Sequence, residues 1–205
     1  MLHLRVHPEN PQARLISQAV ERIRAGDVVV YPTDAAYAIG CQIGNKNAME
    51  RIAQIRGLGP KHQYAILCCD LSGIATYAKV DNATYRLLKN NTPAVTTFIL
   101  TATSEVPRRL MHPKKKTIGL RIPSNPICQQ ILQELGEPLL TSTLILPGQE
   151  DPLDDPYDIE MQLGKRIDVF VDGGIGTLST TSIVDLSGEQ PVIIRRGVGD
   201  VSAFE

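Results

Sequence analysis

The chain has 205 residues, of which 42% are hydrophobic and 21% charged, and its formal net charge is −1. This balance is typical of a globular protein with a sizeable core, and it excludes disordered, collagen-like and coiled-coil chains. The length fits one domain, which we take to span residues 1–205. No stretch approaches the roughly 20 apolar residues of a membrane helix, and the first residues are too polar for a signal peptide. We therefore expect a cytoplasmic protein with no membrane partner.

Two classes of site are disfavoured by residue content. Aromatic residues make up only 4% of the chain and tryptophan is absent, which argues against binding of single-stranded nucleic acid or sugars by stacking. The four histidines are scattered, and no two cysteines form a C-x-x-C pair. We therefore expect reduced, buried thiols and no protein-bound metal. The four cysteines are Cys41, Cys68, Cys69 and Cys128.

In the first half of the chain, predicted helices alternate with predicted strands. Asn10-Pro11 indicates the start of a helix, because a capping residue followed by proline is a common first turn. Apolar residues at helical spacing follow as far as Ile23, and Gly26 ends the helix. The continuous apolar run 28–31 is typical of a strand covered on both faces. Further along, the pattern predicts a helix over 46–56, a strand over 64–69 and a helix over 81–90.

In the second half, strands predominate. One more helix is predicted, from Ser124-Asn125-Pro126 to Gly136, and residues 147–160 form an acidic, proline-rich loop. This order predicts an α/β (α+β-like) fold: a single-domain twisted mixed open sheet with helices on its faces. The predicted strands are 96–100, 117–122, 139–144, 168–171, 181–186 and 191–195.

The charge is unevenly distributed. No acidic residue occurs from Val106 to Gln133, so a nearly neutral chain carries a basic segment, which suits phosphates or nucleic acid as well as a solvated turn. Arg121 differs from the other basic residues because it lies inside an apolar strand pattern. A buried arginine needs an anionic partner, supplied by the protein or by a ligand. The other basic residues are Arg108, Arg109, Lys114, Lys115 and Lys116.

Four segments in order resemble one family, although the chain contains no Walker loop, no G-x-S-x-G and no H-E-x-x-H. The segments are Tyr31–Gly40 (YPTDAAYAIG), Thr117–Pro123 (TIGLRIP), Leu140–Thr143 (LTST) and Thr181–Leu186 (TSIVDL), the last followed by Ile194–Gly197 (IRRG). They resemble the motifs of the YrdC-like family, the threonylcarbamoyl-AMP synthases. The sequences of three further segments, MERIAQIR, NNTPAVTTFIL and EVPRRL, are similar to those of the YciO branch of that family.

The resemblance implies a reaction. In this family threonine and bicarbonate give a carbamate, which attacks the α-phosphorus of ATP and releases pyrophosphate. The product, threonylcarbamoyl-AMP, is the donor for a tRNA adenosine modification. Such a transfer depends on in-line positioning and on cations that offset the triphosphate charge. ATP, an L-threonine-like molecule and Mg²⁺ carried by the nucleotide are the implied ligands.

The resemblance also implies site residues. Thr33, Arg121, Ser142 and Thr181 match positions that hold threonine in the family. Arg56, Thr117 and Arg195 match nucleotide-contacting positions, as does Gln63 with a less certain alignment. A concave basic surface of the family binds double-stranded RNA or tRNA, and Arg108–Lys116 would contribute to it.

The chain departs from the family pattern at three positions. The K-x-R element reads Gln54-Ile55-Arg56, so its lysine is missing, and the S-x-N element reads Ser142-Thr143-Leu144, so its asparagine is a leucine. Cys68 stands where the family often has histidine. Loss of one charge-stabilising group typically costs about 10²–10³ in rate. These departures predict weak or altered catalysis.

Three functions therefore stay open. The first is a slow or altered ATP-dependent threonylcarbamoyl-AMP synthase. The second is a non-catalytic RNA-binding module that kept the fold. The third is a transferase or hydrolase acting on another carbamoylated or adenylated substrate.

Overall fold

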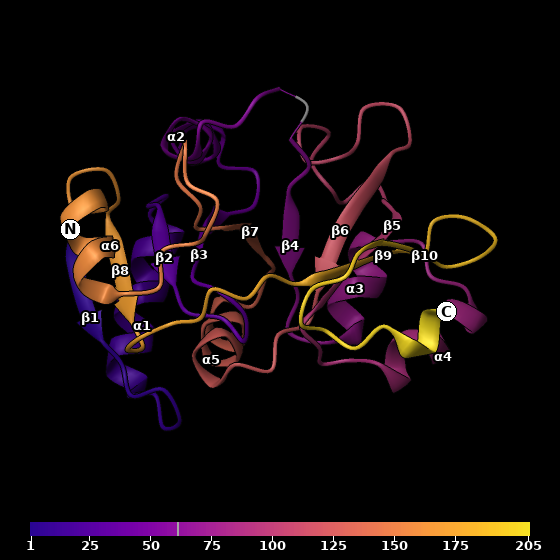
Figure 1. Cartoon of the computed structure of the whole chain (residues 1–205), viewed down its shortest axis with the longest axis horizontal. Helices are drawn as coiled ribbons and strands as arrows, with labels where there is room; N and C mark the ends of the chain where they lie inside the picture. Colours follow the sequence, from indigo (N-terminus) through magenta and orange to yellow (C-terminus); the bar gives the residue numbers. More distant parts are fainter. Residues whose placement is uncertain (61) are drawn as a thin grey trace.

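The computed structural model describes residues 1–60 and 62–205, and in this part of the chain ten strands form one mixed sheet (Figure 1). The strand order across the sheet is β1-β8-β2-β3-β7-β4-β6-β5-β9-β10. The strands are β1 (Leu2–Arg5), β2 (Val29–Tyr31), β3 (Ala38–Gln42), β4 (Ala65–Leu67), β5 (Thr96–Thr101), β6 (Thr117–Arg121), β7 (Leu139–Thr143), β8 (Val169–Asp172), β9 (Ser182–Asp185) and β10 (Val192–Arg195).

Parallel and antiparallel pairs alternate irregularly in this sheet. The pairs β1/β8, β2/β8, β4/β6 and β5/β9 are parallel, whereas β2/β3, β3/β7, β4/β7, β5/β6 and β9/β10 are antiparallel. The predicted mixed α/β fold is therefore confirmed. The helices are α1 (Ala13–Arg24), α2 (Lys46–Arg56), α3 (Leu71–Tyr77), α4 (Asn82–Asn90), α5 (Pro126–Leu135) and α6 (Pro156–Leu163), with a short 3-10 turn η1 (Ser202–Phe204).

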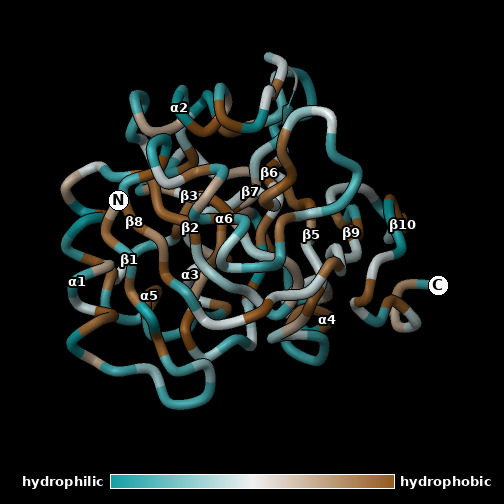
Figure 2. Tube along the Cα trace, turned by 60° about the vertical axis from the view of Figure 1, so that its left-hand side comes forward, coloured by the Kyte–Doolittle hydropathy of each residue, from teal (hydrophilic) through white to brown (hydrophobic). Residues whose placement is uncertain are grey.

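Two hydrophobic cores hold the helices against the sheet. One core joins α1 and α5 to β1, β2 and β8, and it includes Ile16, Ile131 and Val169. The other core contains apolar residues of α2, α3, α4 and α6 together with Phe98 and Leu120. Figure 2 shows the hydrophobic positions gathered toward the interior and the hydrophilic ones along the outer loops. Neighbouring strand residues such as Val29 and Val30 enter different cores, as expected for a strand covered on both faces.

Several predicted boundaries are wrong. Helix α1 begins at Ala13 with Gln12 as the capping residue, because the backbone N–H groups of Glu9 and Asn10 bond to the ring of His7 and hold a separate turn before the helix. The predicted loop 147–160 contains the start of α6, where Asp155 accepts a hydrogen bond from the N–H of Tyr157 and Pro156 occupies the first turn. The strands β1 and β3 and the helix α3 were not predicted at all.

The connection between β8 and β9 crosses most of the sheet. These strands lie second from opposite edges, so residues 173–181 run over the intervening strands (Figure 1). The crossing segment is fixed near its ends by hydrogen bonds from the N–H of Gly173 to the Tyr37 hydroxyl and from the N–H of Ala36 to the carbonyl of Ser179. Its last residues therefore lie beside the motif that follows β2. Across the described residues, no helix has the length and apolar character needed to cross a membrane.

Candidate functional site

An open cleft of about 260 Å³ lies at the centre of the sheet, and residues from distant parts of the chain line it. The floor consists of small and apolar side chains, among them Ala65, Thr97, Gly119 and Ile183, from β4, β5, β6 and β9. The polar residues come from the motifs. Of the positions implied by the family resemblance, Thr33, Arg56, Gln63, Arg121, Ser142, Thr181 and Arg195 all line this cleft.

Arg56 enters the cleft from the last turn of α2. Its Nε donates to the carbonyl oxygen of Ile145 at 3.0 Å and its Nη1 donates to Ser142 Oγ at 2.5 Å. The helix ends beside it because Gly57 adopts a left-handed conformation with φ 64°. Arg56 is therefore fixed by β7 and by the segment that follows it. Burial lowers its pKa from the ordinary arginine value.

Arg195 enters from the opposite edge of the sheet, on β10. Its Nε and Nη2 donate to the carbonyl oxygen of Thr181 at 2.9 and 2.7 Å, and Nη2 also reaches Thr181 Oγ1 at 3.0 Å. A register irregularity between Ile193 and Arg195 interrupts the pairing of β10 with β9 at this point. Such irregularities redirect side chains, and here the guanidinium lies over the start of β9.

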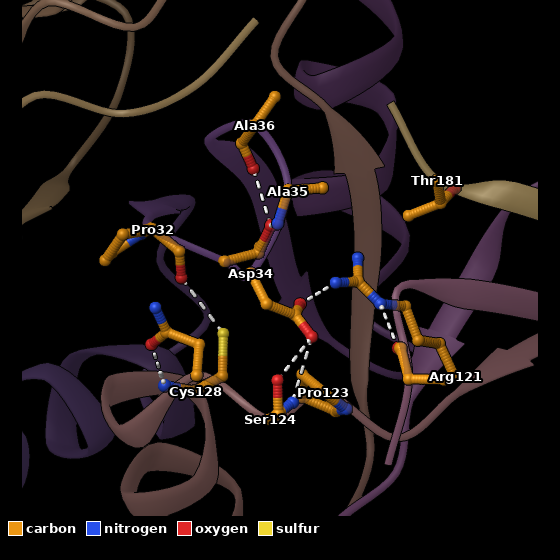
Figure 3. A network of polar contacts seen from close by, with 12 residues as sticks. Pro32, Asp34, Ala35, Ala36, Arg121, Pro123, Ser124, Cys128 and Thr181 are labelled. Atoms are coloured by element: carbon orange, nitrogen blue, oxygen red, sulfur yellow. Dashed lines mark hydrogen bonds and ion pairs between the residues drawn. The ribbon is translucent and has the colours of Figure 1, made fainter. Parts of the chain in front are cut away.

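Arg121 has the anionic partner that the sequence required. Its Nη2 pairs with Asp34 Oδ1, and the two side chains are only 6% and 11% exposed. The other Asp34 oxygen accepts hydrogen bonds from the N–H and the hydroxyl of Ser124, at 3.0 and 2.9 Å. Figure 3 shows Asp34 between Arg121 and Ser124, with Thr181 on the far side of the guanidinium. The Arg121 Nε donates to the carbonyl of Ala94 at 3.3 Å.

The electrostatic character of the cleft is cationic. Three guanidinium groups line it, of which Arg121 is already paired with Asp34, and none of the described lining residues is an aspartate or glutamate. The remaining polar groups are mainly hydroxyls, some of which are held by the backbone. Thr33 Oγ1, for example, donates to the carbonyl of Ala36 at 2.6 Å and accepts from the N–H of Ala35 at 2.9 Å. Guanidinium and hydroxyl groups together suit an anionic small molecule with several oxygen atoms.

The structure corrects the placement of Thr117, Gln54, Leu144 and Cys68. Thr117 is buried at the start of β6 and lies outside the described cleft lining. Gln54 is exposed on α2, because residues two apart on a helix point about 200° apart and Arg56 takes the inward direction. Leu144 and Cys68 are fully buried in the core, where burial raises the pKa of the Cys68 thiol to about 12. None of these four side chains faces the cleft.

Among the cleft residues that sequence reasoning missed are two aromatic rings next to Gln63. His62 and Tyr64 line the cleft next to Gln63, and their rings meet edge to face with centroids 5.0 Å apart. In the sequence, His62 stands out only as one of four scattered histidines. The signal that could have found it is its position six residues after Arg56, in the segment that leads into β4.

The basic segment lies in the connection between β5 and β6. Arg108, Arg109 and Lys114–Lys116 are exposed. His112 holds the turn, because its Nδ1 accepts from the N–H groups of Lys114 and Lys115 at 3.2 and 3.0 Å. Arg109 pairs with Glu50 of α2 at 3.7 Å, and among the described residues the other four have no carboxylate within ion-pair distance.

Comparison with known proteins supports the motif reading. A family model described as Sua5/YciO/YrdC, telomere recombination, matches residues 21–197. This chain belongs to that family. The YciO protein of Escherichia coli (strain K12) is 53% identical over 199 residues, which cover 97% of each chain. The crystal structure of E. coli YciO superposes with a TM-score of 0.95 at 52% identity and covers all of both chains.

More distant members of the family carry a named activity. The threonylcarbamoyl-AMP synthase of Vibrio vulnificus (strain YJ016) is 26% identical over 186 residues, which cover 89% of this chain and 98% of the synthase. The P. abyssi Sua5 protein complexed with L-threonine has a TM-score of 0.87 at 22% identity, over 96% of this chain and 58% of that protein. This last likeness shows that the two share the fold. The chain is therefore a YciO-like member of a family related to threonylcarbamoyl-AMP synthases.

Proposed function

We propose that the cleft binds ATP together with threonine or a threonine-like amino acid and acts as a slow threonylcarbamoyl-AMP synthase. The carbamate formed from the amino acid and bicarbonate, with loss of water, would be joined to the adenylate of ATP. The observation that carries the proposal is the convergence of Arg56, Arg121 and Arg195 on one cleft that has no described acidic lining residue. A triphosphate and a carboxylate together need this concentration of positive charge. The relation to the Vibrio vulnificus synthase supports the reaction class.

In this proposal, the position of each side chain in the cleft determines which part of the substrates it contacts. Arg56 and Arg195 lie on opposite sides of the cleft and would orient the phosphates, so that the carbamate oxygen attacks the α-phosphorus while the bond to the β-phosphate oxygen breaks. Arg121 would receive the amino-acid carboxylate, beside the hydroxyl groups of Thr33 and Thr181. Pyrophosphate leaves and threonylcarbamoyl-AMP remains. The protein supplies positioning and charge rather than a covalent intermediate.

Mg²⁺ would enter with the nucleotide. The lining groups that carry oxygen are hydroxyls and carbonyls without a described carboxylate, and Mg²⁺ prefers carboxylates or phosphates as charged ligands. The donor set thus fits an ion held mainly by the phosphate oxygens. The ion would offset part of the phosphate charge.

The proposal is tested by pyrophosphate release from ATP and bicarbonate, with and without L-threonine, and by mass spectrometry of the adenylate. We expect slow, threonine-dependent release. Arg56→Ala and Arg195→Ala should each lower the rate by about 10²–10³. Arg86→Ala is the matched control, because Arg86 is exposed on α4 and lies outside the cleft lining. Release that ignores threonine but responds to another amine would reassign the substrate, and no adenylate with any amino acid would refute the synthase.

A second candidate function is binding of double-stranded RNA or tRNA through the basic segment. The observation that favours it is the exposure of Arg108 and Lys114–Lys116 without a described carboxylate partner. A-form RNA is bound largely through its backbone and shape, which suits a surface of cations in a chain with few aromatic residues. This function is compatible with the synthase, since a tRNA is the acceptor implied for the product.

A further inference from the structure

We propose that His62 is a fourth cationic ligand of the cleft, which binds a polyphosphate together with Arg56 and takes up a proton as the polyphosphate binds. This inference rests on the proposed binding of a triphosphate in the cleft, but it does not require turnover. It concerns a side chain that the family motifs do not assign.

The position of His62 is the first part of the argument. His62 lines the cleft with Arg56 and is partly buried. Its ring is held against Tyr64, edge to face. The ring therefore lies in the same cleft as the guanidinium that the resemblance assigns to the nucleotide.

The charges around His62 are the second part. Arg56 of α2, Arg121 of β6 and Arg195 of β10 share the cleft with it, Tyr64 contacts its ring, and no acidic residue is present among the described lining residues. Burial and the positive charge of Arg56 both lower the pKa of His62 below its ordinary value of 6.5. At neutral pH the empty cleft thus holds a neutral imidazole.

A bound polyphosphate reverses this balance. Negative phosphate oxygens beside the imidazole favour its charged form, and an opposite charge at about 4–6 Å typically shifts a pKa by about 1–3. The imidazolium then donates a charge-assisted hydrogen bond to the phosphate. His62 therefore adds a cation to the cleft only when the anion is present.

The test measures each histidine by NMR. The chain has four histidines, and their ring proton shifts are followed against pH with and without saturating inorganic triphosphate, with His62→Gln to assign the resonance. We expect the pKa of His62 to lie below 6.5 in the free protein and to rise by about 1–3 with triphosphate. Arg56→Gln should raise the pKa of His62 in the free protein, because the repelling charge is gone.

The opposite outcomes are specific. A pKa of His62 that triphosphate leaves unchanged would overturn the inference, whether the anion fails to bind or binds elsewhere. A response to triphosphate that is confined to the ring signals of His112 would place the anion on the basic segment. That result would also overturn the inference. If His62→Gln does not fold, single variants of the other three histidines assign the signal by elimination. A rise at His62 without adenylate formation would keep this inference and reject the synthase.

Discussion

Asp34 and Arg121 form the most buried ion pair described in the chain, with side chains 11% and 6% exposed. Removal of one partner leaves a buried charge without compensation, which typically costs about 3–5 kcal/mol. We therefore expect Asp34→Ala to lower the free energy of unfolding by about 3–5 kcal/mol. Urea denaturation at pH 7 measures this change.

The matched variant for that prediction is the double change Asp34→Leu, Arg121→Met. It removes both charges and keeps apolar volume, so most of the lost stability should return. The double variant should nevertheless fail to bind threonine, because the cleft loses Arg121. A single variant as stable as the wild type would contradict the importance of the pair.

Leu144 gives the second prediction at the scale of a residue. Its side chain is fully buried in the core that contains Ile66 and Leu140, so Leu144→Asn would place an amide among apolar groups. We expect a loss of about 2–5 kcal/mol in unfolding free energy, comparable to Leu144→Ala, and no gain in adenylate formation. Denaturant unfolding and mass spectrometry check the two parts. A gain in activity with unchanged stability would mean that the segment after β7 can turn this side chain into the cleft.

Asp168 connects three elements through one carboxylate. At the start of β8 it accepts from the N–H of Val28 at 2.8 Å, before β2, and from Arg51 Nη1 of α2 at 2.6 Å. Burial by itself raises the pKa of Asp168, but the hydrogen bonds from Arg51 and Val28 and the charge of Arg51 outweigh it. The net pKa lies below the ordinary 3.8. Asp168 therefore favours the folded state in its charged form.

The sign of the pH effect follows from that direction. Because the folded pKa is below the unfolded one, the stabilisation is present above about pH 4 and is lost as the pH falls through the folded pKa. We expect wild type and Asp168→Asn to differ clearly in urea unfolding at pH 7 and to converge as the pH falls through the folded pKa of Asp168, which lies below 3.8. Glu189→Gln, an exposed carboxylate outside the strands, should show little difference at either pH. A gap between wild type and Asp168→Asn that does not change with pH would exclude this linkage.

At the scale of the whole molecule, the basic segment predicts the salt dependence of RNA binding. Changing Lys114, Lys115 and Lys116 to alanine should weaken binding of an RNA duplex and reduce the slope of log affinity against log salt. The slope should fall by about one phosphate contact for each lysine lost. Fluorescence anisotropy over a salt series measures both quantities.

The control keeps the net charge of that variant. Lys79, Lys89 and Lys165 are exposed elsewhere in the molecule, so the triple alanine variant at these positions removes the same charge from other surfaces. It should keep the wild-type slope. Equal losses of RNA affinity in the two triple variants would show that only the overall charge matters. If neither variant lost affinity, the basic segment would be a solvated turn without a role in RNA binding.

Local patterns determined much of the fold. The alternation of helical and strand patterns predicted the mixed α/β class, and the capping sequence Ser124-Asn125-Pro126 marked the start of α5, where Asn125 accepts from two backbone N–H groups. The same signal misled at Asn10-Pro11 and was overlooked at Asp155-Pro156. A cap signal is local, whereas competing bonds such as those of His7 decide whether the helix begins there.

The sequence by itself determined which residue types the cleft collects, because motif order identified Arg56, Arg121 and Arg195 together. It also required an anionic partner for Arg121, since an unpaired buried charge is costly. Only the tertiary structure decided that this partner is Asp34, that Leu144 and Gln54 face away, and that His62 faces inward. The reason is physical: these facts depend on which strands pair and on where a side chain points, and both are set by contacts between segments far apart in the chain.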